Sequence, residues 1–97
     1  MELDLGVERH NGTTVVTVAG EIDMATAAEL RECLVGTQGH VIVDLRGVSF
    51  LDSSGIGTLA SARTRLLKTG GDLRLRKPQK IVRKALEVTG LASWIED

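Results

Sequence analysis

The sequence predicts an α/β fold: a single domain over residues 1–97 with the element order ββαβαβα and a mixed sheet of about four strands. Stretches with the two-residue period of a strand alternate with stretches of helical spacing, which is typical of parallel strands joined by right-handed crossovers. A turn sequence joins the first two strands. No Pro-rich or Gly/Ser-rich tract divides the 97 residues, so they form one compact unit with its own core.

The first two strands are predicted to pair as an antiparallel hairpin. Apolar residues occupy every second position over residues 3–7, and residues 13–19 form a run rich in β-branched side chains. Asn11 and Gly12 between them tolerate the positive φ angles of a tight turn. The first strand is therefore expected as an antiparallel edge strand of an otherwise parallel sheet.

Two helices follow from apolar residues at three- and four-residue spacing. The first begins after Asp23 or Thr26, either of which has a side chain suited to the N-cap, and stops at Gly36. The second covers residues 54–69 and begins at the serines of the stretch "DSSG". Both helices are amphipathic and are expected to cover the sheet.

Residues 41–45 are almost continuously apolar, which predicts a central strand covered on both faces. Residues 72–76 alternate again and predict the last strand. Pro78 suits the first turn of a third helix that ends before Gly90. The residues expected to form the buried stripe of that helix are Ile81, Val82, Ala85 and Val88.

Composition and charge argue against several classes of partner. The net charge is −1, and only Phe50 and Trp94 are aromatic, so we expect no nucleic-acid binding. A basic leader and a long apolar run are lacking, which predicts a cytoplasmic protein that does not contact membrane. Cys33 has no partner for an internal disulfide, and His10 and His40 lack metal-site spacing, so no metal is expected.

Loops at the carboxyl ends of parallel strands share one edge of a sheet, where open α/β folds place their sites. The loops expected at this edge are residues 20–23, residues 48–55 and residues 76–78. Half of the twelve basic residues lie between positions 74 and 84. One hypothesis is that this basic segment attracts an acidic partner or a phosphate, with Arg76 and Lys77 at the same edge as the serines.

The serines themselves allow three interpretations. A nucleophilic serine is disfavoured because the GxSxG turn and a nearby histidine are missing. A structural role is open: Asp52, Ser53 or Ser54 caps the second helix, with Ser54 the better of the two serines, while Gly55 and Gly57 allow close approach of another group. The third interpretation is that Ser53 is phosphorylated.

A phosphate on Ser53 is compatible with the fold, because a helix amino end favours negative charge. The phosphate adds about −1.5 to −2 charges beside Asp52 and across the edge from Glu21 and Asp23. If this edge docks a partner, burying an uncompensated charge costs about 3 to 5 kcal/mol. A cost of this size lowers the affinity for the partner about a hundredfold or more, which is enough for phosphorylation to switch binding off.

Three stretches of the chain resemble the STAS domains, and among them the bacterial anti-sigma factor antagonists. They are "GEID" at 20–23, "VIVDLRGVSFLDSSGIG" at 41–57 and "KPQKIVRKALEVTGL" at 77–91, of which the second is the most specific. The resemblance implies a regulator, not an enzyme, that binds an anti-sigma factor of the GHKL serine kinase type and frees a sigma factor. It also implies phosphorylation on Ser53, reversal by a PP2C-type phosphatase and no cofactor, since ATP belongs to the kinase.

The surface expected to contact the kinase comprises Glu21, Asp23, Asp52, Ser53, Ser54 and Gly55. An alternative is a STAS scaffold or accessory subunit of a stress-signalling assembly or a lipid transporter, without phosphate turnover. For either role we expect a monomer or a weak dimer.

Overall fold

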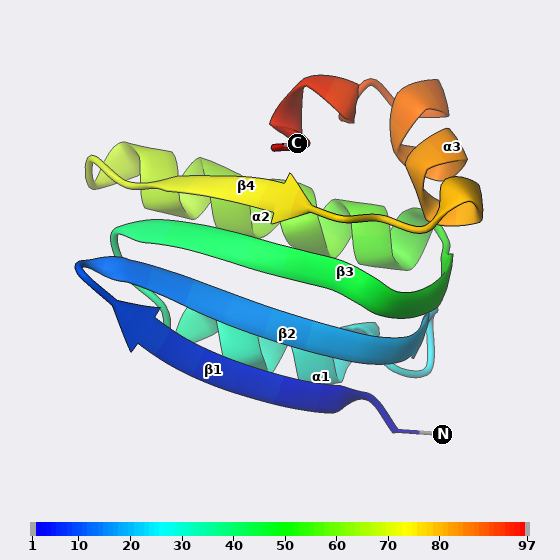
Figure 1. Cartoon of the computed structure of the whole chain (residues 1–97), viewed down its shortest axis with the longest axis horizontal. Coiled ribbons are helices and arrows are strands. Elements are labelled where there is room, and N and C mark those ends of the chain that lie inside the picture. The colour runs from blue at the N-terminus through cyan, green and yellow to red at the C-terminus, as the bar shows by residue number, and fades with distance from the viewer. Residues whose placement is uncertain (1, 97) are drawn as a thin grey trace.

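The computed structural model describes residues 2–96 and has the predicted order of strands and helices, with one short 3-10 helix added at the end (Figure 1). The elements are β1 (Asp4–His10), β2 (Thr13–Ile22), α1 (Ala27–Val35), β3 (His40–Leu51), α2 (Ser53–Lys68), β4 (Asp72–Arg76), α3 (Lys80–Val88) and η1 (Ala92–Trp94).

The four strands form one mixed sheet in the order β1-β2-β3-β4. β1 pairs antiparallel with β2, and the turn between them has Asn11 at φ 52° and Gly12 at φ 85°, which confirms the predicted hairpin. β2, β3 and β4 are mutually parallel. The fold class and the position of β3 inside the sheet are therefore confirmed.

The helices α1 and α2 cover one face of the sheet, and α3 and η1 lie beyond its β4 edge (Figure 1). The core fills the space between the sheet and these helices, with fully buried Val16, Val43, Leu59 and Leu75 among its members. On the other face Asp44 and Arg46 follow Ile42 at every second position of β3. No helix covers this second face, so the expectation that the strand is covered on both faces is wrong (Figure 1). The alternation of apolar and polar residues is not visible over residues 41–45, because Ile42 on the second face is apolar.

Both central strands run further than predicted. β2 continues to Ile22 and β3 to Leu51, and these two residues pair in register. Both side chains are buried, so strand pairing at this end is stabilised by the core. Two register shifts in the β2–β3 pairing accommodate extra residues of β3, which periodicity cannot reveal. Residues 20–22 and 48–51 of the predicted loops are consequently strand.

The third helix differs from its prediction in where it begins and in which face it buries. α3 starts at Lys80, so Pro78 precedes the helix and does not lie in its first turn. Its buried residues are Val82 and Leu86, whereas the side chains of Ile81 and Val88 are 62% and 74% exposed. Both sets have helical spacing, and the position of α3 at the edge of the sheet decides which one enters the core.

Candidate functional site

The amino end of α2 is capped by an aspartate. Asp52 Oδ1 accepts hydrogen bonds from the backbone N–H groups of Ser54, at 2.9 Å, and Gly55, at 3.3 Å. These bonds satisfy two of the N–H groups that a helix start leaves without partners. The preference for Ser54 as the capping serine is therefore wrong, because Asp52 occupies the N-cap position and its side chain binds the N–H groups of Ser54 and Gly55.

The two serine hydroxyls are left unbound by this arrangement. Ser53 is exposed and Ser54 is half-buried, and within residues 2–96 neither hydroxyl makes a hydrogen bond. Ser53 occupies the first position of α2, where the positive end of the helix dipole favours an anion. An anionic group on Ser53 would face solvent and leave the cap formed by Asp52 in place.

The two glycines of the first turns have different surroundings. A Cβ atom on Gly55 would overlap Leu51 Cδ1 and lie 2.6 Å from Ile22 Cγ2, so the start of α2 packs directly onto the ends of β2 and β3. A Cβ atom on Gly57 would meet nothing within 4 Å. The fold requires glycine at position 55, whereas position 57 is open to solvent.

The loop before α1 lies beside this helix start. The backbone N–H of Asp52 donates to the carbonyl of Ile22 at 3.1 Å, which joins the ends of β2 and β3. Asp23 follows Ile22 in the chain, and its Oδ1 accepts hydrogen bonds from the backbone N–H groups of Ala25, at 2.9 Å, and Thr26, at 3.1 Å. Thr26 precedes α1 and makes no side-chain cap, but its hydroxyl accepts from the backbone N–H of Asp23 at 3.0 Å and donates to the carbonyl of Glu21 at 2.7 Å, so Asp23 and Thr26 together shape this loop. Glu21 is exposed at the end of β2.

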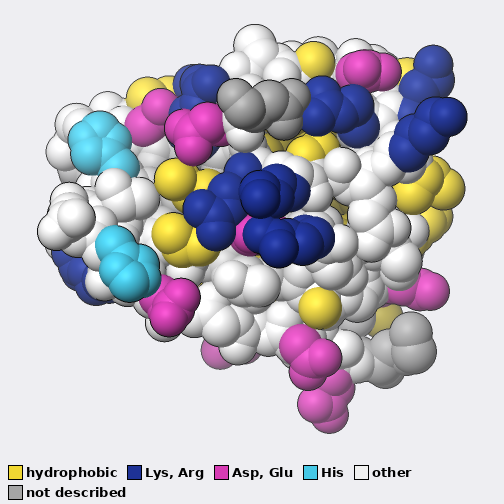
Figure 2. Space-filling model, in the orientation of Figure 1, with side chains coloured by type: hydrophobic (Ala, Val, Ile, Leu, Met, Phe, Trp, Pro, Cys, Tyr) yellow, Lys and Arg dark blue, Asp and Glu magenta, His cyan; other side chains and the backbone are white. Residues whose placement is uncertain are grey.

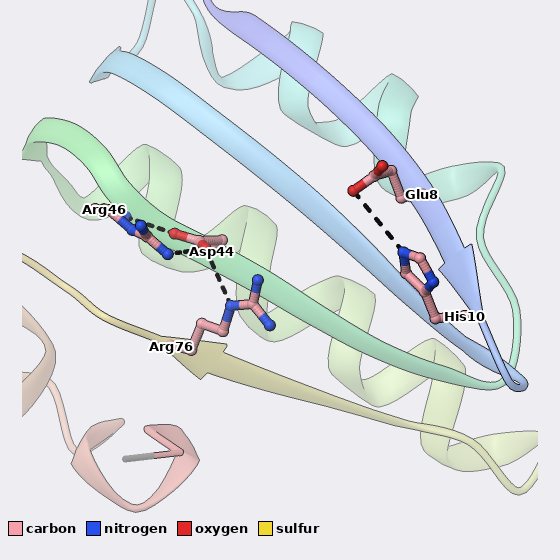
Figure 3. A network of polar contacts seen from close by, with 5 residues as sticks. All are labelled: Glu8, His10, Asp44, Arg46 and Arg76. Carbon is pink, nitrogen blue, oxygen red and sulfur yellow. Dashed lines mark hydrogen bonds and ion pairs between the residues drawn. The ribbon is translucent and has the colours of Figure 1, made fainter.

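A second charged cluster lies on the sheet face without helices (Figures 2 and 3). Asp44 Oδ1 accepts from the backbone N–H of Arg46 at 2.9 Å, and its Oδ2 accepts from Arg76 Nε at 3.0 Å and Arg46 Nη2 at 3.4 Å. Burial alone would raise the pKa of Asp44. The hydrogen bonds from Arg46 and Arg76 and their positive charges outweigh burial, so the pKa is lowered from its ordinary value.

This cluster also corrects the hypothesis that Arg76 lies at the serine edge. Arg76 pairs in register with Asp44, and β3 continues seven residues further to Leu51. Because β4 is the shorter strand, Arg76 lies beside the middle of β3, where its guanidinium is bound by Asp44.

The histidines lie at the far end of the sheet from the serines. His10 ends β1 and His40 begins β3, and both pair with Thr13. Ser53 follows the opposite end of β3. A base for nucleophilic serine catalysis is therefore not supplied to Ser53 by either histidine.

Two hollows flank Ser53, one on each side. The hollow toward α1 is lined by Met24, Arg31, Gly57 and Ser61, together with Ser53 and Ser54. The hollow toward α3 is largely apolar, and Asp52 and Ser53 are among the residues that line it. Sequence patterns did not predict the second hollow, because the apolar residues of α3 that line it were assigned to the core.

The site and the fold together match a known family. The family model of the STAS domain matches residues 4–96. The chain belongs to the STAS domain family. The anti-sigma-B factor antagonist of Bacillus subtilis is 32% identical over 99 residues, in an alignment that covers 99% of this STAS domain and 91% of the relative.

Two solved structures have the same architecture. The anti-sigma factor antagonist SpoIIAA in its unphosphorylated form superimposes with a TM-score of 0.84 at 27% identity, over 97% of this STAS domain and 87% of that chain. The Bacillus cell fate determinant SpoIIAA in the phosphorylated form superimposes with a TM-score of 0.77 at 26% identity, over 97% and 90%. Across residues 2–96 no helix is long and apolar enough to span a bilayer.

Proposed function

We propose that this STAS domain is an anti-sigma factor antagonist, which binds an anti-sigma factor and so releases a sigma factor for transcription. The names of its relatives support this function. The observation that carries the proposal is the position of Ser53. This exposed residue is the first of α2 and lies between two hollows, while the side chain of Asp52 caps the helix. The hydroxyl is thus accessible to another protein without any loss of the bonds that hold the helix.

The proposed partner is an anti-sigma factor that is also a serine kinase of the GHKL type. It transfers the γ-phosphoryl group of ATP to Ser53 Oγ: the new O–P bond forms, the bond to the leaving ADP breaks, and the hydroxyl proton passes to the kinase. A PP2C-type phosphatase hydrolyses the phosphoserine and restores the hydroxyl. ATP is bound by the kinase, so this domain needs no cofactor for the cycle.

Phosphorylation at this position would change binding far more than stability. The phosphate adds about −1.5 to −2 charges at an edge that already carries Glu21, Asp23 and Asp52. A docked partner would bury this charge, at a cost of about 3 to 5 kcal/mol if nothing compensates it. The proposed contact surface comprises Glu21, Asp23, Asp52, Ser53, Ser54 and Gly55, in which the buried Gly55 serves to keep α2 close to β2.

The test is to incubate the protein with each purified anti-sigma factor kinase of its host and ATP, and to map the phosphate by mass spectrometry. We expect label on Ser53 and none on a Ser53→Ala variant. Ser53→Asp should bind the same kinase about a hundredfold or more weakly than wild type, which corresponds to the cost of burying the charge. Ser93→Asp, a charge at another exposed serine, is the control and should bind like wild type.

Absence of label on Ser53, together with equal binding by wild type and Ser53→Asp, would contradict the proposal. If the protein instead remained in a large complex whose composition did not change on substitution of Ser53, the scaffold alternative would replace it. Native mass measurement of the complex distinguishes the two.

A further inference from the structure

The third helix has two apolar faces, and only one of them packs into the core. Val82 and Leu86 are buried, whereas Ile81 and Val88 lie on the outer face and are largely exposed. Across from them, Phe50 at the end of β3 is 43% exposed. The hollow between these elements, called the α3 groove below, is lined by Phe50, Ile56, Ile81, Lys84, Ala85 and Val88, together with Asp52 and Ser53.

The groove concentrates apolar surface that the fold leaves uncovered. Of the seven large apolar residues that the described chain exposes, Phe50, Ile81 and Val88 line this one hollow. Scattered exposed apolar side chains are ordinary, but a contiguous apolar patch bordered by polar residues marks an interaction surface. Hydrophobic side chains are visible at the surface at the α3 end of the molecule (Figure 2).

We propose that the α3 groove receives an apolar side chain of the anti-sigma factor that recognises Ser53. This inference rests on the proposed function and names the anchor of that interaction. The groove and the proposed phosphorylation site share Asp52 and Ser53, and Glu21 of the proposed contact surface pairs in register with Phe50. A protein seated over Ser53 therefore also covers the groove.

Area and affinity favour an anchor at this place. A specific interface buries about 800 Å² on each partner, and its affinity comes mostly from a few side chains in well-packed apolar pockets. The residues beside Ser53 on α2 are small, namely Ser54 and Gly57, and offer little apolar area. The α3 groove adjoins them and has the aliphatic and aromatic walls that a leucine- or methionine-sized side chain requires.

The same geometry links the anchor to the phosphorylation switch. Asp52 and Ser53 are among the residues that line the groove, so a partner side chain that fills the groove lies beside both. A phosphate on Ser53 would then be stripped of water beside an apolar contact, where an uncompensated charge is strongly unfavourable. Phosphorylation would thus expel the anchor without altering α3.

The proposal is tested by titration calorimetry with each purified anti-sigma factor kinase of the host, loaded with a non-hydrolysable ATP analogue so that Ser53 stays unmodified. Ile81→Ser and Val88→Ser should each weaken binding about tenfold, because each removes apolar area from an anchor site. Phe50→Ser tests the opposite wall and should have the same effect. Val35→Ser is the matched control, since Val35 is 63% exposed, like Ile81, and lies outside the groove.

Ser53→Asp is titrated in the same series, and thermal unfolding shows that each variant is folded. If Ser53→Asp binds weakly while both helix variants and Phe50→Ser bind like wild type, the groove inference is overturned and the phosphorylation switch stands. If the groove variants bind weakly while Ser53→Asp binds like wild type, the anchor stands and the switch fails. If wild type binds none of the kinases, or if it self-associates through the groove in sedimentation experiments, the inference is overturned.

Discussion

Two aspartates of one chain segment make the same local hydrogen bond in very different surroundings. Asp44 in the middle of β3 and Asp52 directly after it each use Oδ1 to accept from the backbone N–H two residues later, both at 2.9 Å. The second oxygen of Asp44 is bound by Arg46 and Arg76 (Figure 3). In the part of the chain that the structure describes, Asp52 has no such cation.

The difference separates a closed polar site from an open one. Around Asp44 the charged groups satisfy one another, and the side chain is only 5% exposed. At Asp52 the side of α2 that faces the sheet, its inner side, packs through Gly55 against the ends of β2 and β3. Ser53 and Gly57 lie on the outer side of the helix and are exposed. The first region stabilises the sheet, and the second leaves room for a partner.

The largest effect is expected from filling the inner side of α2. Gly55→Val should lower the free energy of unfolding by about 3 kcal/mol, because its Cβ and methyl groups overlap the buried Leu51 and Ile22. Chemical denaturation measures this change. Gly57→Val is the matched control, since the space around position 57 is open. Equal losses for the two variants would contradict the distinction between an inner and an outer side.

A smaller effect is expected from opening the closed site. Asp44→Ala should lower the free energy of unfolding by about 2 kcal/mol at neutral pH, because it removes charge-assisted hydrogen bonds from both arginines. The arginines can still reach water, since the side chain of Arg46 is 66% exposed. A loss too small to measure would show that the cluster is not a stabilising feature.

The lowered pKa of Asp44 adds a dependence on pH to the same variant. The pKa of Asp44 is lower in the folded state than in the unfolded state, where it is about 3.9. The contribution to stability is therefore complete above that value and is lost as the pH falls through the folded pKa. The difference between wild type and Asp44→Ala should shrink as denaturation is repeated from about pH 5 toward about pH 2.

The smallest effect is expected on the outer side and has the opposite sign. Gly57→Ala should raise the free energy of unfolding by about 0.5 to 1 kcal/mol, because alanine favours the helix and its methyl group meets no neighbour. Chemical denaturation again measures the change.

Under the proposed function the same methyl group should weaken binding to the anti-sigma factor, because it makes the hollow toward α1 shallower.

The site shows where sequence patterns stop being sufficient. The pattern of residues 52–57 predicts a helix that starts at the serines, and this is confirmed because capping and propensity act over a few neighbouring residues. The capping residue stays open among Asp52, Ser53 and Ser54 in the sequence, because several polar residues in a row are equally suited by type, and the structure selects Asp52. Which contacts Ser53 makes with a partner stays a prediction.

Three features follow from the sequence alone, namely the order of strands and helices, the hairpin at Asn11 and Gly12, and the family. These depend on local periodicity, turn chemistry and a specific motif. Two features become visible only in the folded chain: Arg76 binds Asp44 away from the serines, and the side chain of Ile81 on α3 is exposed. Strand length, register and the position of a helix at the sheet edge depend on contacts between distant residues, and these contacts place an apolar groove beside Ser53.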